Sequence, residues 1–317
     1  MSLDIQHITK KFGDFTAVDD VSFTVRPGTI FGFLGTNGAG KTTTMRMILD
    51  IIRPDSGSIT WNGNPTRDMP RADFGYLPEE RGLYPKMVVE DQLLFLAQLY
   101  GASKHDAQAR LDEWLKRLNI EENRRKTVEQ LSKGNQQKIQ LLAAMLHDPE
   151  ILVMDEPYSG LDPVNAEQMK DAFREMRDRG KTIIFSTHQL DDAQELSSDV
   201  AIIHRGRMIV SGSVMDVRKS TGEHYVRFAV AGHPDLPWLE TMPDVQIVNR
   251  KPDYLELAVS DPVVAQRVLQ EAVRRELPVT RFDIDYPSLN EVFLTRVKQM
   301  GTAMQPTAEE LAAVPAG

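Results

Sequence analysis

The sequence predicts an α/β fold with a wound sheet over residues 1–215, followed by a small α+β domain over residues 216–300. Short apolar runs alternate with amphipathic helical patterns through the first part of the chain. The runs "TIFGFL", "ILVM" and "TIIFS" are apolar throughout, which is typical of parallel strands buried on both faces. Near residue 213 the alternation ends, and a pattern of strand, strand, helix and strand replaces it. We therefore expect two domains of different architecture.

In the first domain, "TIFGFL" is expected to be a strand and "KTTTMRMILDII" the helix after it. The segments "VVEDQLLFLAQLYG" and "KHDAQARLDEWLKRLNI" have helical spacing and form a mostly helical insert. Another helix is expected to begin after Ser132, because a serine there suits an N-cap and apolar residues then recur at helical spacing. The runs "ILVM" and "TIIFS" supply two further strands.

The second domain is expected to contain strands in "EHYVRFAVAG" and "DYLELAVS", a helix in "PVVAQRVLQEAVRREL", a strand in "VTRFDIDYP" and a last helix in "SLNEVFLTRVKQM". The tail over residues 301–317, "GTAMQPTAEELAAVPAG", is rich in Ala and Pro and is expected to be disordered.

The composition excludes several classes of protein. Hydrophobic residues make up 41% of the 317 residues and charged residues 26%, an ordinary globular balance. The formal net charge of −9 argues against a DNA-coating surface, so we expect no nucleic acid as a partner. The absence of cysteine excludes disulfides and thiolate metal sites. No run approaches the roughly 18 apolar residues of a membrane span, and we expect no transmembrane segment.

The stretch "GTNGAGKTT" matches G-x-x-x-x-G-K-[ST] in full and lies between an expected strand and an expected helix. Gly38 and Gly40 allow backbone amides to surround a phosphate, Lys41 offsets its negative charge, and the Thr42 hydroxyl can bind Mg²⁺. A Gly-rich turn that binds nothing is the alternative, and the full motif in this context favours nucleotide binding. The expected nucleotide-binding residues are Gly35, Thr36, Asn37, Gly38, Ala39, Gly40, Lys41, Thr42 and Thr43.

Polar residues follow the two other apolar strands. Asp155 and Glu156 come directly after "ILVM", where ligands bind in open α/β sheets. Asp155 suits the Mg²⁺ shell, and Glu156 can polarise an attacking water. His188 follows "TIIFST" and can hydrogen-bond a γ-phosphate and hold Glu156. An acidic turn and a polar strand cap are the alternatives, and the phosphate-binding motif in the same sheet favours the catalytic interpretation.

The stretch "LSKGNQQ" predicts a second anion site without a second nucleotide motif. A helix that begins after Ser132 has free backbone amides at its first turn, and these attract anions. Lys133 in that turn opposes the helix dipole, which is a departure from the usual charge preference. The simplest explanation is that this helix end covers the γ-phosphate of a nucleotide held by another copy of the chain.

Five motifs, "GTNGAGKTT", "LSKGNQQ", "ILVMDEP", "SGLD" and "STH", follow one another in this order. Over residues 1–215 they resemble the nucleotide-binding domain of ABC ATPases. The resemblance implies a P-loop NTPase fold, hydrolysis of ATP with Mg²⁺, and a head-to-tail homodimer that forms on ATP binding. In such a dimer the signature helix of one subunit completes the ATP site of the other.

The resemblance also implies roles for single residues. The signature positions that act in trans are Ser132, Lys133, Gly134, Asn135 and Gln136. Phe12 matches the aromatic residue that stacks on adenine, and Asp162 ends the "SGLD" loop that crosses to the opposite site.

Three positions depart from the family pattern. Lys133 replaces a usual Gly, and Asn135 stands beside Gln136 where the family usually has one Gln. Glu79 in "GYLPEERGLYP" stands where the family commonly has a Gln that contacts Mg²⁺ and the transport partner. A carboxylate can still bind Mg²⁺. These variants resemble those of bacterial exporter ATPases with a small C-terminal domain, and "YPSLNEVFLTRV" resembles the end of that domain.

The expected function is that of the ATP-hydrolysing subunit of an ABC exporter, which drives a separate transmembrane permease subunit. The expected location is cytoplasmic, peripheral at the inner face of the cell membrane. The alternative is an ABC ATPase that acts on ribosomes or DNA. Those relatives usually carry two such ATPase domains or a long coiled-coil insert, and this sequence shows one ATPase domain and no coiled-coil insert.

Overall fold

The computed structural model describes residues 2–80, 82–222, 224–232 and 236–303. The chain divides into two compact units, Met1–Ser213 and Val214–Gly317. The last helix continues through residues 301–303, which the sequence places in the tail, and residues 304–317 lie outside the described part.

The first unit contains a six-stranded sheet in the order β10, β9, β3, β8, β7, β6. All neighbours run parallel except β10, which pairs antiparallel with β9. β3, β7 and β8 are the apolar runs that predict buried parallel strands, and every residue of all three is buried. The bounds are Ile30–Leu34 (β3), Phe74–Leu77 (β6), Ile151–Asp155 (β7), Thr182–Thr187 (β8), Asp199–His204 (β9) and Arg207–Ser213 (β10).

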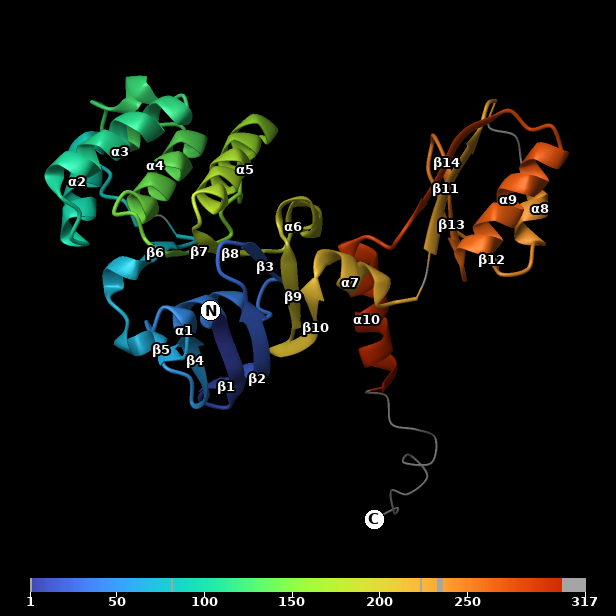
Figure 1. Ribbon diagram of the computed structural model, residues 1–317, viewed down its shortest axis with the longest axis horizontal. Helices are drawn as coiled ribbons and strands as arrows, with labels where there is room; N and C mark the ends of the chain where they lie inside the picture. Colours follow the sequence, from blue (N-terminus) through green and yellow to red (C-terminus); the bar gives the residue numbers. More distant parts are fainter. Residues whose placement is uncertain (1, 81, 223, 233–235, 304–317) are drawn as a thin grey trace, which may run out of the picture. The chain divides into compact units, whose positions relative to one another are not determined.

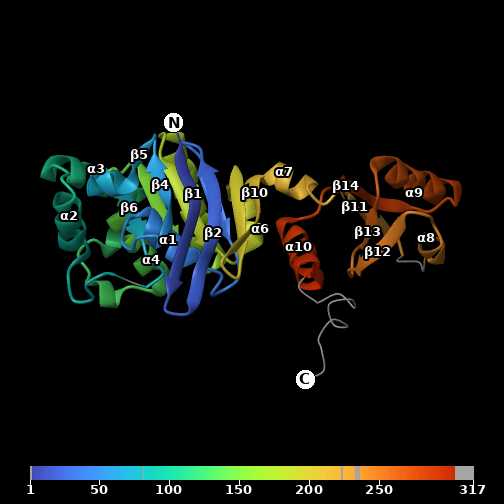
Figure 2. The ribbon, with the colours of Figure 1, turned by 90° about the horizontal axis from the view of Figure 1, so that it is seen from below.

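A second, antiparallel sheet in the order β2, β1, β4, β5 was not expected from the α/β alternation. Figure 2 shows β4, β1 and β2 side by side. The bounds are Leu3–Phe12 (β1), Phe15–Val25 (β2), Ser56–Trp61 (β4) and Asn64–Pro65 (β5). Apolar side chains from both sheets and from helix α1 (Lys41–Ile48) form one buried cluster, so the helix that follows the phosphate loop is fixed between two sheets.

Helices α2 (Val89–Leu99) and α3 (Lys104–Arg117) form the expected helical insert, and α4 (Lys133–Met145) follows them in the chain (Figure 1). Helix α4 begins as predicted, because the Ser132 side chain accepts a hydrogen bond from the Asn135 amide at 3.3 Å. Helices α5 (Pro163–Asp178) and α6 (Leu190–Leu196) follow β7 and β8. Short 3₁₀ turns cover Thr66–Asp68, Arg71–Asp73, Glu121–Asn123 and Val128–Gln130.

The second unit has a four-stranded antiparallel sheet in the order β12, β13, β11, β14 and a core of its own. All five elements expected from the sequence are present; α7, α8 and β12 were not predicted. The bounds are Val214–Lys219 (α7), His224–Val230 (β11), Pro237–Glu240 (α8), Val245–Arg250 (β12), Leu255–Val259 (β13), Pro262–Arg274 (α9), Val279–Asp285 (β14) and Leu289–Ala303 (α10). None of the helices in the described ranges has the length and hydropathy needed to span a bilayer.

Candidate active site

Three parallel strands end side by side at one edge of the six-stranded sheet. β3 leads into the phosphate loop, β7 into the acidic pair, and β8 into His188. β8 lies between the other two strands, and Leu34 pairs with Thr187. On the other side of β8, Asp155 pairs with Ser186. The residues that the sequence places after separate strands therefore converge in space.

The phosphate loop has a backbone conformation that requires glycine. Gly38 and Gly40 have positive φ angles of 76° and 106°. A Cβ on Gly40 would lie 2.5 Å from the Ala17 carbonyl oxygen, so no other residue fits. Gly40 is also the N-cap of α1, and no side chain in the described structure caps that helix. The first amides of α1 are therefore available to an anion.

Lys41 is a buried cation at the start of α1. Its Nζ donates to the carbonyl oxygens of Gly35 at 2.9 Å and Thr36 at 3.3 Å. It also lies 3.2 Å from Oε1 of Glu156, which is buried as well. The loop thus holds one positive charge against the carboxylate that follows β7.

Asp155 is buried, and one of its two carboxylate oxygens is hydrogen-bonded: Oδ1 accepts from the Ser186 hydroxyl. Within the residues that the structure describes, Oδ2 has no hydrogen-bond partner. A buried carboxylate oxygen without a donor suits a bound cation, because an unpaired buried charge is costly. Asp155 therefore fits a place in a Mg²⁺ shell.

Glu156 turns the chain away from β7 with a positive φ of 49°. Its amide donates to both the carbonyl and the hydroxyl oxygen of Ser186, each at 3.2 Å. Its Oε2 lies 2.9 Å from Nδ1 of His188, which is the contact that the sequence predicts. The sequence did not reveal this role of Ser186, which is one of three hydroxyl residues in β8.

A cavity of about 390 Å³ opens at this edge of the sheet. It joins the phosphate loop to Glu79, whose carboxylate is exposed at the cavity. The lining residues are Phe15, Ala17, Asn37, Gly38, Gly40, Lys41, Thr42, Thr43, Glu79 and Glu156. Among the described residues, no group of three or more His, Asp or Glu side chains is arranged as a metal site. A Mg²⁺ ion here would take most of its ligands from water and phosphate, which is its usual preference.

The aromatic residue at the cavity is Phe15, whose side chain is 63% exposed. Phe12, the residue that the resemblance implies, is its cross-strand partner in the β1–β2 hairpin and is not among the lining residues. The Phe12 ring is 51% exposed, and Lys10 Nζ lies 5.8 Å from its centroid. Both rings are therefore accessible on the hairpin, and Phe15 has the position beside the phosphate loop.

None of the signature residues 132–136 lines this cavity. Instead, the segment packs against the start of α5. A Cβ on Gly134 would lie 2.7 Å from Nδ2 of Asn165, and that amide donates to Oδ2 of Asp162. Oδ1 of Asp162 in turn accepts from the amides of Val164 and Asn165, each at 3.0 Å. Asn165, which the sequence did not reveal, thus brings the signature segment and the "SGLD" aspartate together.

The remaining signature positions differ in exposure. Ser132 and Lys133 are exposed, and Asn135 is half-buried. The side-chain amide of Gln136 donates to the carbonyl oxygens of Val128 at 3.0 Å and Leu131 at 3.2 Å. The first turn of α4 therefore presents Ser132 and Lys133 to solvent.

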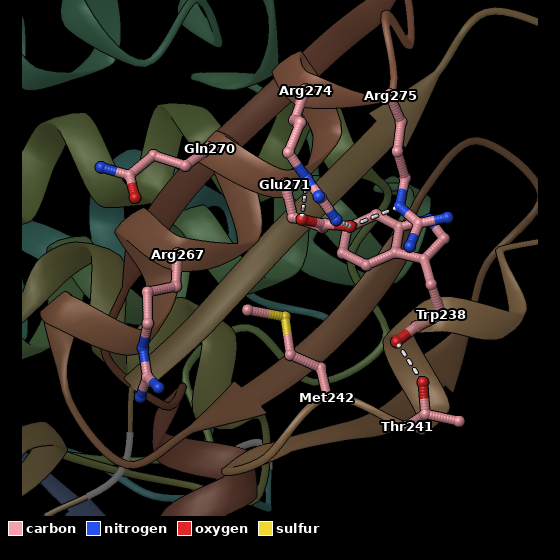
Figure 3. A pocket seen from close by; sticks show the side chains of 8 residues that line it. All are labelled: Trp238, Thr241, Met242, Arg267, Gln270, Glu271, Arg274 and Arg275. Atoms are coloured by element: carbon pink, nitrogen blue, oxygen red, sulfur yellow. Dashed lines mark hydrogen bonds and ion pairs between the residues drawn. The ribbon is translucent and has the colours of Figure 1, made fainter.

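A second cavity, of about 450 Å³, lies in the second unit between α8 and α9 (Figure 3). Its lining residues are Trp238, Thr241, Met242, Arg267, Gln270, Glu271, Arg274 and Arg275. Glu271 accepts hydrogen bonds from both Arg274 and Arg275, and these guanidinium groups lower the pKa of its carboxyl to about 2. This cavity has no phosphate loop and no strand-end carboxylates, so it lacks the chemistry of the first.

The chain is similar to known proteins over most of its length. Residues 18–159 match the family described as ABC transporter, and residues 212–297 match the family described as ATP-binding protein DrrA1-3-like, C-terminal domain. ABC transporter ATP-binding protein YhaQ of Bacillus subtilis (strain 168) is 41% identical over 295 residues, which are 93% of this chain and 98% of that protein. Nod factor export ATP-binding protein I of Burkholderia pseudomallei (strain 1710b) is 38% identical over 214 residues, 67% of this chain and 70% of that protein.

Among solved structures, an ATP binding subunit of an ABC transporter superimposes with a TM-score of 0.65. It is 31% identical in sequence and covers 70% of this chain and 94% of its own. The parallel sheet, the phosphate loop and these similarities agree on the fold and the reaction. This chain therefore belongs to the ABC transporter ATP-binding proteins and is an ATPase with a P-loop fold.

Proposed function

We propose that the chain powers a separate transmembrane permease, in the direction of export, through an ATP-dependent homodimer. One observation carries the proposal: the phosphate-loop cavity is separate from the exposed first turn of α4. Two copies placed head to tail would let the α4 end of each copy face the nucleotide of the other. The free amides behind Ser132 would then bind a γ-phosphate.

The site residues suit a reaction in which water attacks the γ-phosphate. Glu156 acts as the general base, and His188 holds its Oε2 at 2.9 Å. The phosphates of ATP compete with Glu156 for the Lys41 charge, because Nζ already lies 3.2 Å from Oε1. Binding of ATP therefore frees the carboxylate to accept a proton from water.

Thr42, Asp155 and Glu79 are the residues that would hold Mg²⁺. Thr42 and Glu79 line the same cavity, and Asp155 has an unpaired buried oxygen near it in the sheet. When bound, Mg²⁺ neutralises charge on the β- and γ-phosphate oxygens. Phe12 and Phe15 are the candidates for stacking on the adenine.

We assign residues 1–215 to the ATPase domain and 216–300 to an accessory domain. The phosphate loop, the strand-end carboxylates and the signature segment all lie in the first of these ranges. The separate apolar core of the second unit supports its assignment as a distinct domain.

Helix α2 and the segment before it provide a surface for the permease. Tyr84, Phe95 and Leu99 are 59%, 52% and 67% exposed, although all three are large and apolar. Phe95 and Leu99 are four residues apart and so share one face of the helix. Exposed apolar side chains that gather in one region mark interaction sites. A permease docked there would place the chain at the inner face of the membrane, and the Nod factor export relative supports the direction of transport.

The experiment that tests the proposal is Glu156→Gln. We expect the variant to bind ATP and to lose about 10²–10⁴-fold in turnover, the usual contribution of a general base. With ATP trapped, sizing should show a monomer that becomes a dimer. Glu121→Gln is the matched control, because it makes the same charge change at an exposed position. A Glu156→Gln protein that hydrolyses ATP at the wild-type rate, or stays monomeric with bound ATP, would contradict the proposal.

A further inference from the structure

The segment that carries Glu79 into the ATP cavity is held by two buried glutamines. It leaves the carboxyl end of β6 at Pro78, and its residues Glu79 and Tyr84 are exposed. Gln140 of α4 donates from Nε2 to the Pro78 carbonyl oxygen at 2.8 Å and to the Glu80 carbonyl oxygen at 3.3 Å. Gln92 of α2 accepts from the Tyr84 amide at 2.9 Å. Both ends of the segment are thus attached to the helical insert.

Gln140 makes its hydrogen bonds through the N–H groups of its side-chain amide. The side chain is 3% exposed, and both of its acceptors are backbone carbonyls directly beside Glu79. Its Oε1 has no partner among the described residues, so donation is the interaction that this side chain makes. Fixing the carbonyls on both sides of one residue restricts the backbone at that residue and hence the direction of its side chain.

The position of Glu79 matters because of its charge. The carboxylate lines the cavity that would receive a polyanionic nucleotide. Close to a bound cation, the Glu79 carboxylate stabilises the site. If it moves toward the phosphates, it repels them. A displacement of a few ångströms decides between the two effects, because Coulomb energy varies with distance. A neutral side chain at position 79 would tolerate such displacement better.

The same helix also holds the second carboxylate segment. Gln137, one turn before Gln140, donates from Nε2 to the Pro157 carbonyl oxygen at 3.0 Å, directly after Glu156. α4 begins at the signature segment. The helix end that we assign to the nucleotide of the other copy is therefore part of the same rigid element that anchors the loops around Glu79 and Glu156.

We propose that Gln140 is a positioning residue for ATP hydrolysis, which sets the place of the Glu79 carboxylate from helix α4. The inference rests on the proposed function, because it takes the cavity as the site of ATP and Mg²⁺. Gln140 acts through the two carbonyls and touches no reacting atom. Its loss should change how Mg²⁺ is bound and how fast ATP is hydrolysed, while the phosphate loop keeps its affinity for nucleotide.

The test is Gln140→Met, which keeps the length of the side chain and removes the donor. We expect the apparent Mg²⁺ constant of the ATPase to rise severalfold and kcat to fall by about tenfold, the scale of one or two lost buried hydrogen bonds. Affinity for Mg²⁺-free ATP should stay within about twofold of wild type. Gln98→Met is the matched control, because Gln98 is exposed and its side-chain amide donates to the Leu94 carbonyl oxygen of its own helix.

A double-mutant cycle with Glu79→Ala separates positioning from plain stability. If Gln140 acts through Glu79, Gln140→Met should leave the Mg²⁺ constant of the Glu79→Ala protein unchanged. The inference would be overturned if Gln140→Met lowered kcat equally in the wild-type and Glu79→Ala proteins, lowered Tm, and left the Mg²⁺ constant unchanged. If Gln140→Met does not fold, Gln140→Asn, which keeps the amide but shortens its reach, takes its place in the same cycle.

The two proposals fail in different ways. Wild-type protein without Mg-ATP turnover, or Glu156→Gln without an ATP-dependent dimer, contradicts the proposed function whatever position 140 contains. Normal turnover and dimerisation together with a Gln140→Met protein that behaves like the Gln98→Met control contradicts only the role of Gln140.

Discussion

At the residue scale, His147 shows how burial selects a protonation state. Its Nε2 lies 2.9 Å from the Phe74 carbonyl oxygen, which can only accept, so Nε2 carries the proton. Its Nδ1 is buried with no partner in the described structure, and the ring stacks on Tyr100 with centroids 4.5 Å apart. Burial is the main cause that lowers the pKa of His147, and the hydrogen bond to Phe74 opposes it. The folded state therefore favours the neutral form of the His147 imidazole.

This burial predicts a pH dependence of stability. Because the pKa of His147 is lower in the folded state than the value of about 6.5 expected when unfolded, protonation favours the unfolded state. The contribution of neutral His147 to the free energy of unfolding is complete above about pH 6.5. It decreases as the pH falls from there through the lower pKa of the folded state. Urea unfolding at pH 7.5, 6.5 and 5.5 should show a smaller decrease in His147→Gln than in wild type. Identical profiles for the two proteins would contradict the assignment.

Single residues differ in how far the sequence could predict them. The phosphate loop, the acidic pair and His188 could be expected to converge, because parallel strands end at a common edge of a sheet. Ser186, Asn165 and Gln140 could not. A serine, an asparagine or a glutamine has ordinary uses throughout a chain, and its partner is fixed only when distant segments meet. Gln140 and Pro78 are far apart in sequence, yet in the fold Nε2 of Gln140 lies 2.8 Å from the Pro78 carbonyl oxygen.

At the scale of elements, α9 depends on one carboxylate at its start. Oδ1 of Asp261 accepts from the amides of Val263 at 2.7 Å and Val264 at 3.1 Å, and Pro262 occupies the first helical position. Pro262 has no N–H to satisfy, so the Asp261 carboxylate satisfies two of the three N-terminal amides that remain without a partner inside the helix.

Asp261→Ala should therefore destabilise the second unit by about 1 kcal/mol, the usual cost of losing such a cap. Amide hydrogen exchange in α9 should become faster, and nucleotide affinity should not change, because the phosphate loop is in the other unit. Asp261→Asn keeps an acceptor and should resemble wild type. If amide exchange in α9 is unchanged in Asp261→Ala, the Asp261 cap does not stabilise the helix.

The elements that the sequence did not predict have weak patterns. β12, "VQIVNR", is an edge strand that pairs only with β13, and it has no fully buried residue. An edge strand with one half-buried face gives little apolar signal. The antiparallel sheet of β1, β2 and β4 was missed for another reason: its strands share a core with the parallel sheet, so their apolar content fits either architecture.

At the scale of the whole molecule, the two units have separate cores. The apolar cluster of the first unit and that of the second have no residue in common, and each is closed by its own sheet. No phosphate-site motif lies beyond residue 213. A chain that ends at Ser213 is therefore expected to fold and to bind nucleotide.

Isothermal titration with Mg²⁺-free ATP should give the truncated chain an affinity within about twofold of the full chain, since no contact of the phosphate loop is lost. The same preparation serves to compare ATP-dependent dimerisation, with Glu156→Gln introduced into both the full and the truncated chain. A truncated chain that is unfolded by circular dichroism would show that the second unit belongs to the core of the first.

The place of β3 in the middle of the six-stranded sheet has a consequence for how the chain is made. β3 is complete once Leu34 has been synthesised, but its neighbours β8 and β9 come about 150 residues later. At roughly 5–20 residues per second, both edges of this apolar strand lack their partners for on the order of ten to thirty seconds. β11 of the second unit has all its partners within about 60 residues. The strand that leads into the phosphate loop is thus among the first to be translated and among the last to be paired.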